Sequence, residues 1–311
     1  MDIRQMKYFM AIAKKRSLAA AAAQLGMAQP SLSQHIKQLE QRLGVELLVR
    51  SSRGVELTEA GHVMLMHAQR IVEATDLALE EVRLAGTEAV GKVVFGFPSS
   101  VSMVLSVPLV ETIRQEHPRI RLRAVEAMSG FIKDWLEDGT VDLAILYDQG
   151  LKNTQSRFLL TETLHFYCSS DDWPFKGQPG TPVSLQDAVR QDLVLPSTTH
   201  GLRQLIDIAC VSVGVAPNVV VEIDSLQQIL ALTALGNAMT ILAPAAAHEY
   251  ESTGRLLSAP IVEPSIRRPA YLVRNPATLV TRASREVERI TIQVVQELVR
   301  RGIWKGRLAE D

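Results

Sequence analysis

The apolar positions near the start of the chain repeat with the period of a helix on both sides of Gly26. Those on the far side are Leu32, Ile36, Leu39 and Leu43. Their steps of four, three and four residues predict a helix with one buried face. This helix should begin at residue 28 or 29, because Pro30 suits a first helical turn. The alanine-rich residues 18–25 predict a shorter helix before it, with Ser17 as its N-cap.

The other face of the second predicted helix is polar in its first half. Gln29, Ser33, Gln34 and Lys37 are the side chains that face outward there. Residues 46–50 and 55–58 then predict two short strands, a β-wing around a turn that carries Arg53. A helix presented in this way fits the DNA major groove, and such a wing suits phosphates or the minor groove. An ordinary helical hairpin with a solvated polar face would show the same periodicity.

A long helix is predicted after the wing, from residue 58 to about residue 88. Its apolar seam consists of Met64, Ala68, Ile71, Thr75, Ala78, Val82 and Ala85. These positions alternate steps of four and three residues, which is the spacing of a coiled-coil seam. We expect the seam to pack against a second copy of the chain, and docking onto the chain's own carboxy-terminal part is the alternative. A dimer would place two recognition helices on a near-palindromic site.

Beyond Gly86 and Gly91 the pattern changes to alternating strands and helices. Strands are predicted at residues 93–97, 120–125, 143–147, 164–168, 193–195, 219–223, 239–242 and 270–273. Helices are predicted at residues 105–117, 131–137, 202–213, 226–235 and 281–301. Repeated β-α-β units imply a parallel sheet with helices on both faces. Two α/β lobes are therefore expected, with the chain crossing between them near residues 160–163 and 262–268.

Polar residues follow several of these strands at their carboxyl ends, where open α/β sheets bind ligands. They lie at Ser99-Ser100, Ser129, Tyr147-Asp148 and residues 196–200. Hydroxyl groups and backbone N–H groups at helix N-termini favour a small anion, so a carboxylate-bearing metabolite is the predicted ligand. Each serine or threonine could equally be a plain N-cap, and His200 and Arg203 taken singly are more typical of surface polar groups.

The amino-terminal part resembles a known family. The matching residues are Ser17, Ala20 to Ala22, Gln29-Pro30-Ser31-Leu32-Ser33, Ile36, Leu39-Glu40, Gly44, Leu47-Leu48, Arg50, Leu57-Thr58 and Ala60-Gly61. They resemble the amino-terminal signature of LysR-type transcriptional regulators, apart from Leu48, where that family usually has Phe. The resemblance implies an α+β multidomain fold: a winged helix-turn-helix, a linker helix that dimerises, and a two-lobed α/β effector domain like a periplasmic binding protein.

The same resemblance implies the residue roles and the domain boundaries. DNA contacts would come from Gln29, Pro30, Ser31, Ser33, Gln34, Lys37, Arg50 and Arg53. Effector contacts would come from Ser99, Ser100, Ser129, Tyr147, Thr199 and His200, and dimer contacts from Met64, Ala68, Ile71, Ala78 and Val82. The DNA-binding domain would span residues 1–58 and the linker helix 59–90. Lobe I would comprise 91–162 with 266–302, lobe II 163–265, and a carboxy-terminal tail 303–311.

Length and charge agree with this organisation. A chain of 311 residues exceeds the usual size of one domain, so two or three folding units are expected. The formal net charge is only −1, yet residues 1–58 carry nine basic and four acidic side chains. That excess lies where salt-dependent attraction to DNA would need it, although a solvated basic face would show the same charge.

The two cysteines, Cys168 and Cys210, form no disulfide framework or metal-ligand pattern, which favours a reducing compartment. We expect both to be buried, because a redox sensor would need an exposed thiol of low pKa. The amino terminus does not read as a signal peptide, and no apolar run is long enough to cross a membrane, so a cytoplasmic location is expected.

Enzyme motifs are missing from the sequence. It has no G-x-S-x-G elbow, P-loop, dinucleotide-binding glycine pattern or H-E-x-x-H, and its seven histidines lack metal-ligand spacing. We therefore expect no catalysis, cofactor or metal, although an enzyme on the same lobed fold is conceivable. A secreted solute-binding module is opposed by the basic amino-terminal part.

The predicted function is that of a sequence-specific DNA-binding transcriptional regulator controlled by a small, carboxylate-bearing effector in the cleft between the lobes. The expected partners are double-stranded DNA, the effector, further copies of the chain as a homodimer or homotetramer, and RNA polymerase, with no membrane. Ligand closure of the cleft would change the spacing between paired recognition helices. The alternative is a DNA-binding regulator without an effector, controlled by abundance or by protein partners.

Overall fold

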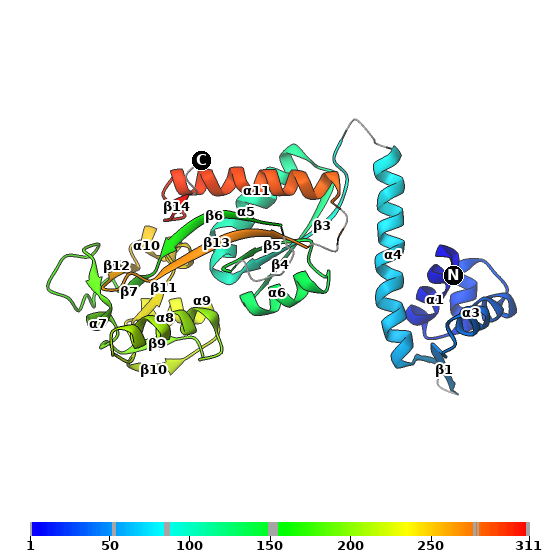
Figure 1. Cartoon of the computed structure of the whole chain (residues 1–311), viewed down its shortest axis with the longest axis horizontal. Helices are drawn as coiled ribbons and strands as arrows, with labels where there is room; N and C mark the ends of the chain where they lie inside the picture. The colour runs from blue at the N-terminus through cyan, green and yellow to red at the C-terminus, as the bar shows by residue number, and fades with distance from the viewer. Residues whose placement is uncertain are drawn as a thin grey trace. The chain divides into compact units, whose positions relative to one another are not determined.

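The computed structural model describes residues 2–51, 54–83, 88–148, 155–275, 278 and 280–308. It divides into two compact units, Met1–Thr87 and Glu88–Asp311, and each is a fold of its own (Figure 1). Within the described ranges, no helix is both long enough and apolar enough to span a bilayer.

The first unit is a winged helix-turn-helix followed by a long helix. Its elements are α1 (Ile3–Lys15), α2 (Leu18–Leu25), α3 (Gln29–Leu43), β1 (Leu48–Ser51), β2 (Gly54–Leu57) and α4 (Glu59–Arg83). The hydroxyl of Ser17 accepts the N–H of Ala20, as expected of an N-cap. Gly26 closes α2 at φ +65°, a left-handed conformation that a glycine adopts without strain. Residue 28 is the N-cap of α3, so the predicted start of that helix is confirmed.

The core of this unit lies between α1, α3 and α4. Leu32, Ile36 and Leu39 are fully buried there, as the apolar stripe of α3 predicted. Leu43 does not join them and is 41% exposed. It lies in the last turn of α3, directly before Gly44, where the left-handed C-cap redirects the chain. The apolar period therefore predicted a buried face that is one helical turn longer than the face that the core covers.

Helix α4 divides its apolar residues between two surroundings. Met64 and Ala68 are buried in the unit's own core with Val72, where α4 packs on α1, so their burial needs no second copy of the chain. Further along, Ile71 is 39% exposed and Val82 is 75% exposed. The predicted seam thus splits into a part used inside the unit and an exposed part, and its last member, Ala85, lies outside the described residues.

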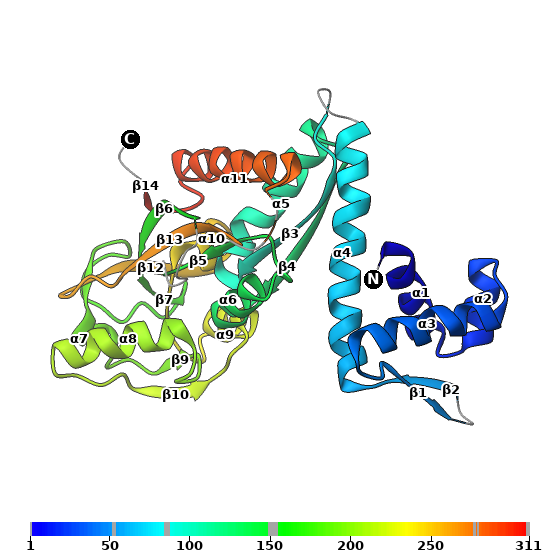
Figure 2. The same ribbon diagram turned by 45° about the vertical axis from the view of Figure 1, so that its right-hand side comes forward.

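Lobe I of the second unit has a six-stranded sheet with the order β14-β6-β13-β5-β3-β4. Its strands are β3 (Gly91–Pro98), β4 (Ile120–Ala127), β5 (Leu143–Leu146), β6 (Gln155–Thr163), β13 (Arg267–Arg274) and β14 (Arg307–Leu308). One face is covered by α5 (Ser99–Glu116) and α11 (Arg282–Arg300), and the other by α6 (Ser129–Glu137) (Figure 2).

The sheet of lobe I is mixed and not parallel throughout. Strand β3 runs parallel to β4 and β5, whereas β13 runs antiparallel to β5 and β6. The expectation of a parallel sheet was therefore wrong for the half of the sheet that contains the crossings. The two crossings continue into β6 and β13, which are long strands that pair with each other. The periodicity of a strand does not reveal whether it pairs in a parallel or an antiparallel direction.

Lobe II lies between the two crossings. Its elements are β7 (His165–Ser169), β8 (Val183–Ser184), α7 (Leu185–Ala188), β9 (Leu193–Leu195), α8 (Gly201–Ser212), β10 (Val219–Glu222), α9 (Leu226–Ala234), β11 (Thr240–Leu242), α10 (Pro244–Ser252) and β12 (Leu256–Val262). They form sheets of order β10-β9 and β11-β7-β12-β8 around one apolar core. Sequence periodicity predicted β7, β9, β10, β11, α8 and α9. It did not predict β8, α7, α10 and β12.

The described part of the predicted carboxy-terminal tail, residues 303–308, packs on lobe I. Trp304 is fully buried in the core of lobe I, and β14 pairs with β6 through Arg307 and Leu308. A side chain at Gly306 would meet Leu160 at 2.8 Å, so the segment lies directly on β6. A single tryptophan gives no periodic pattern that would predict its burial. Trp304 is buried because α11 ends where the following residues meet the core of lobe I.

Replacement of Gly61 by Ala tests the junction of the wing and α4. The added methyl group would overlap the carbonyl oxygen of Leu47, which accepts the N–H of Thr58 at 3.0 Å and so cannot move freely. We expect Gly61→Ala to destabilise the first unit by about 1–3 kcal/mol, as overpacking does. Calorimetry on the full chain would show a lower unfolding temperature for that unit. Gly130→Ala, which meets nothing within 4 Å, is the control, and equal behaviour of the two variants would contradict this packing.

Candidate functional site

Helix α3 presents a polar face at its first two turns. Gln29, Pro30, Ser31, Gln34 and Lys37 are exposed, and Ser33 is half-buried. No side chain caps the helix and no acidic residue lies in its first turn, so the positive end of its dipole is open to an anion. The opposite face is fully buried, which fixes the direction in which these side chains point. The surface can place polar groups on base edges and phosphates together.

The β-wing is fixed to the helices by backbone and carboxylate contacts. Glu40 of α3 accepts the N–H groups of Leu47 and Leu48 at 2.9 and 3.2 Å, and Val55 donates to the carbonyl of Arg16 at 3.0 Å. Leu48 is 6% exposed within the core, so it fills the position where the family usually has Phe. Arg53 and the side chain of Arg50, both predicted to contact DNA, lie outside the described residues.

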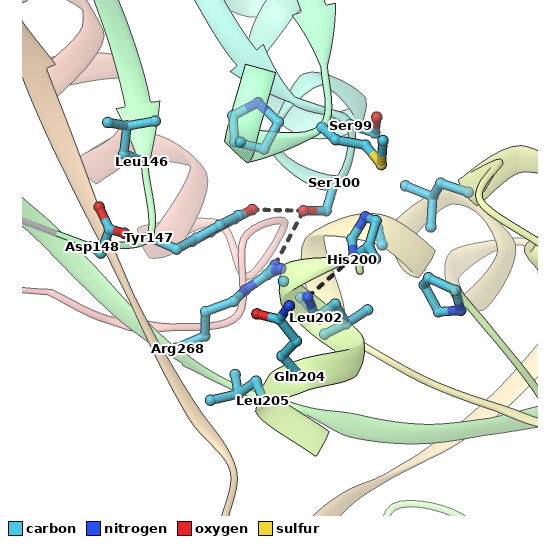
Figure 3. A pocket seen from close by; sticks show the side chains of 18 of the residues that line it. Ser99, Ser100, Leu146, Tyr147, Asp148, His200, Leu202, Gln204, Leu205 and Arg268 are labelled. Atoms are coloured by element: carbon cyan, nitrogen blue, oxygen red, sulfur yellow. Dashed lines mark hydrogen bonds between the residues drawn. The ribbon is translucent and has the colours of Figure 1, made fainter. Parts of the chain in front are cut away.

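A cleft of about 860 Å³ lies between the two lobes. Five of the six predicted effector residues line it: Ser99, Ser100, Tyr147, Thr199 and His200. The side chain of Ser129 lies outside the described part of the chain, but its neighbours Met128 and Gly130 line the cleft. Lobe I supplies the strand ends after β3 and β5, and lobe II supplies the loop before α8 (Figure 3). The fold thus brings together residues that are far apart in the sequence.

Five helices of the described chain begin at this cleft. Their first turns or N-caps contribute Pro98, Met128, His200, Leu226 and Ala243 to its lining. Side chains cap none of α5, α6, α9 and α10. The first N–H groups of a helix have no partner inside the helix, and they carry the positive end of its dipole. The cleft therefore has a field that favours negative charge.

Arg268 is the functional residue that sequence reasoning missed. It lines the cleft from β13, its Nη2 donates to Ser100 at 3.1 Å, and its guanidinium lies 3.8 Å from the ring centroid of Tyr147. Ser100 and Tyr147 share a hydrogen bond of 2.6 Å (Figure 3). The only sequence signal was its position at the second crossing between the lobes.

Glu162 holds Arg268 in place. This fully buried carboxylate accepts from Nε and Nη2 of Arg268 at 3.1 and 2.8 Å, and from the indole N–H of Trp304 at 2.7 Å. Burial lowers the pKa of Arg268, but Tyr147 and Glu162 outweigh it and raise that pKa above its usual value. Burial raises the pKa of Tyr147 to about 12, so this phenol stays protonated at neutral pH. Tyr147 is therefore a neutral hydrogen-bonding group in the cleft.

His200 is also neutral. Its Nδ1 accepts the N–H of Leu202 at 3.1 Å, which leaves the ring proton on Nε2. Burial lowers the pKa of His200, the charge of Arg268 lowers it further, and Asp224 acts in the opposite direction. Because the ring caps α8 and lines the cleft, the expectation that it is an ordinary surface group does not hold.

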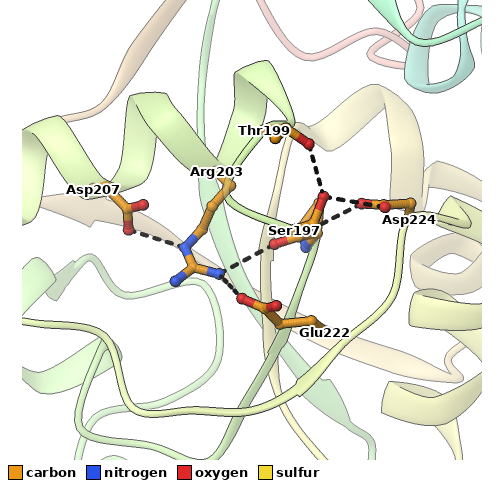
Figure 4. Close-up of polar contacts among 7 residues, drawn as sticks. Ser197, Thr199, Arg203, Asp207, Glu222 and Asp224 are labelled. Atoms are coloured by element: carbon orange, nitrogen blue, oxygen red, sulfur yellow. Dashed lines mark hydrogen bonds and ion pairs between the residues drawn. The ribbon is translucent and has the colours of Figure 1, made fainter.

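The loop before α8 is held by a network of charged residues (Figure 4). Asp224 accepts from the backbone N–H and the hydroxyl of Ser197 at 2.9 and 3.1 Å, and that hydroxyl lies 3.1 Å from the hydroxyl of Thr199. The backbone hydrogen bond from Ser197 is the main cause that lowers the pKa of Asp224. Thr199 is thereby fixed at the rim of the cleft.

Arg203 has a structural place in the same network. It is 9% exposed and bonds to Asp207 at 3.0 Å, to Glu222 at 2.9 Å and to the carbonyl of Pro196 at 3.2 Å (Figure 4). The sequence suggested a surface polar group here. The structure shows instead a buried cation that joins the loop to α8 and β10.

Both cysteines lie in apolar surroundings of lobe II. Burial raises the pKa of Cys168 to about 12 and that of Cys210 to about 11, and both thiols are buried and free. Neither has the exposed, acidified thiol of a redox sensor. Within the described ranges, no three His, Cys, Asp or Glu residues come together as metal ligands.

Comparison with known proteins agrees with both units. Residues 3–62 match the bacterial regulatory helix-turn-helix protein, lysR family, and residues 86–295 match the LysR substrate binding domain. The nitrogen assimilation regulatory protein nac of Klebsiella aerogenes is 29% identical over 297 residues, which are 95% of each chain. That of Escherichia coli strain K12 is 31% identical over 249 residues, 79% of this chain and 80% of its own.

Solved structures show the same fold along the whole chain. The full-length CbnR structure with its target DNA has a TM-score of 0.64 at 22% identity and covers 96% of this chain and 99% of its own. A cysteine mutant of Corynebacterium glutamicum OxyR with bound H2O2 has a TM-score of 0.60 at 26% identity, covering 96% of both chains. The protein belongs to the LysR family of bacterial transcription regulators, in which a helix-turn-helix binds DNA and a two-lobed domain binds a small-molecule effector.

Proposed function

We propose that the polar face of α3 reads the operator and that the interlobe cleft binds a small carboxylate-bearing effector. The cleft carries the proposal, because five helix N-termini and the hydroxyls of Ser99, Ser100 and Thr199 converge there. Backbone N–H groups and hydroxyls at such ends bind anions by directed hydrogen bonds. A cleft of about 860 Å³ matches the size of a small metabolite site.

The charges in the cleft narrow the effector class. Arg268 is paired with Glu162, and Lys133 lies 3.6 Å from Asp148. Asp134, Asp224 and Arg267 also line the cleft. A highly charged polyanion would therefore meet carboxylates, whereas one carboxylate group fits the donors at the start of α5 and α8. The remaining wall, with Phe131, Leu205 and Ile208, suits an apolar body on the ligand.

The effector acts on DNA binding through a shift between two lobe orientations. Because the cleft is lined from both lobes, a ligand that contacts both sides stabilises the closed orientation over the open one. The size of this shift is limited by the ratio of the ligand's affinities for the closed and the open orientation. The resulting change in the assembly would alter the spacing of paired α3 helices on the operator.

Self-association is proposed along the exposed part of α4. Ile71, Leu79 and Val82 are 39%, 54% and 75% exposed, and Ala78 is exposed beside them. An apolar stripe of this kind on a helix is stabilised by a second helix. Two copies paired there would present two α3 helices to a near-palindromic site.

Gln29 and Ser33 test the reading face. We expect Gln29→Ala and Ser33→Ala to weaken binding to the operator by about 1–3 kcal/mol for each lost base contact, with random DNA little affected. Lys37→Ala is the matched contrast on the same helix, because a phosphate contact contributes equally on every sequence. It should lower both affinities and flatten the salt dependence. Fluorescence titration against both DNAs at several salt concentrations would measure this, and an unchanged operator-to-random ratio in the first two variants would remove them from the reading face.

Ile71→Asp tests the α4 stripe. A carboxylate on this face would have to be desolvated for a second helix to pack, so the variant should dissociate at concentrations where the wild type is assembled. Gln69→Asp, on the opposite side of α4 by the helical repeat, is the control. Sedimentation velocity reports both. If the two variants sediment like the wild type, α4 does not carry the assembly.

Ser100→Ala tests the effector site. We expect at least one small mono- or dicarboxylic acid from a panel to raise the unfolding temperature of the wild type, with the effect reduced in Ser100→Ala. Loss of a charge-assisted hydrogen bond costs about 1.5–3 kcal/mol, or roughly tenfold to a hundredfold in affinity. Ser106→Ala on the same helix is the control, because its hydroxyl donates to the Ser102 carbonyl. A wild type that responds to no acid would instead support a regulator controlled by abundance or protein partners.

A further inference from the structure

Two stretches of backbone cross between the lobes in the described part of the chain, and they touch each other. The first crosses at Leu164, whose N–H donates to the carbonyl of Ile266 at 2.9 Å in the second crossing. Ile261 donates back to the carbonyl of Leu164 at 3.1 Å. This two-stranded hinge joins the cores of the two lobes, and α10 of lobe II also packs on α5 of lobe I, where Ala245 is buried in the core of lobe I. The backbone hydrogen bonds of the hinge and the packing of α10 on α5 therefore both connect the lobes.

The segment 303–308, here called the C-terminal strap, lies beside this hinge and contacts both lobes. Its first anchor is in lobe I, where fully buried Trp304 donates to the Oε1 atom of Glu162 at 2.7 Å. Glu162 is the penultimate residue of β6, directly before the first crossing, and its other oxygen holds Arg268 in the cleft. The strap therefore contacts the group that positions a cleft residue.

The second anchor is in lobe II and belongs to the next residue. Lys305 donates to both carboxylate oxygens of Glu251 at 2.7 Å, and Ser258 of β12 donates to Oε1 of the same carboxylate at 2.7 Å. Glu251 lies near the end of α10, whose first turn lines the cleft at Ala243 and Ala246. Two consecutive residues thus join a buried carboxylate of lobe I to a helix of lobe II.

We propose that Trp304 and Lys305 are positioning residues of the effector cleft, and that the C-terminal strap sets the resting angle between the lobes. The inference rests on the proposed function, since the cleft concerned is the effector site. The strap is a further connection between the lobes besides the two crossings and the packing of α10 on α5, and its contacts with Glu162 and Glu251 are made by side chains. A ligand that changes the interlobe angle must strain or remake the Lys305–Glu251 contact.

The strength of that contact suits such a role. Lys305 and Glu251 are 43% and 22% exposed, so water competes with their ion pair. A pair of this exposure changes an equilibrium by no more than about fivefold. That is enough to bias two lobe orientations, yet small enough for a bound metabolite to overcome. Trp304, by contrast, is a permanent anchor, because its indole is fully buried.

Hydrogen exchange on the full-length protein without any added ligand tests the strap. In Lys305→Met the amides of Leu164 and Ile261 should exchange about 1.5- to 5-fold faster than in the wild type, the range that an exposed ion pair supports. Lys305→Arg should restore the wild-type rate. Glu251→Gln should give the same acceleration, and the double variant Glu251→Gln/Lys305→Met no more than either. The amides of β3, in the centre of lobe I, should keep their rates.

Arg300→Met is the matched control, because it removes the exposed Arg300–Glu297 pair on α11 just before the strap. Unchanged Leu164 and Ile261 amides in Lys305→Met, or an equal acceleration in Arg300→Met, would overturn the proposal. Trp304→Phe should accelerate the same amides further, and should it fail to fold, the Lys305 and Glu251 variants still decide. Because no effector is used, this result is separate from whether any acid binds the cleft.

Discussion

The pairing of Glu162 with Arg268 is the interaction on which the architecture of the second unit depends. A fully buried carboxylate is tolerated only when its oxygen atoms are hydrogen-bonded, and here the donors come from β13 and from the segment after α11. The carboxylate itself is on β6, so three distant parts of the chain must be in place at once. The same pair determines where the guanidinium of Arg268 stands in the cleft.

This pairing also decides how the cleft can recognise a ligand. Arg268 is neutralised by Glu162, and both Tyr147 and His200 are uncharged at neutral pH. Lys133 and Arg267 also line the cleft, so in the proposed site an acid would meet these cations together with directed donors at helix N-termini and hydroxyls. Such a site separates one metabolite from another by the placement of its donors and by the shape of its wall.

The first unit illustrates how one helix serves two purposes. Met64 and Ala68 of α4 complete the core under the wing, whereas Ile71 and Val82 remain exposed on the same helix. The early part of α4 therefore holds the recognition helix in position. The later part is exposed, and in the proposed dimer it would contact another copy, so the spacing of the two α3 helices would depend on how the α4 helices pair.

The sequence by itself determined which face of α3 is buried, through the period of Leu32, Ile36 and Leu39, and its resemblance to the LysR-type signature indicated the helix-turn-helix. It also indicated several residues of the cleft, since Ser99, Tyr147 and Thr199 closely follow buried strands. The tertiary structure alone decided the sheet direction, the burial of Trp304 and the place of Arg268 in the cleft. Local periodicity records which face of an element is buried. The partner of a single charged or aromatic residue in a distant part of the chain is fixed only when the strands pair.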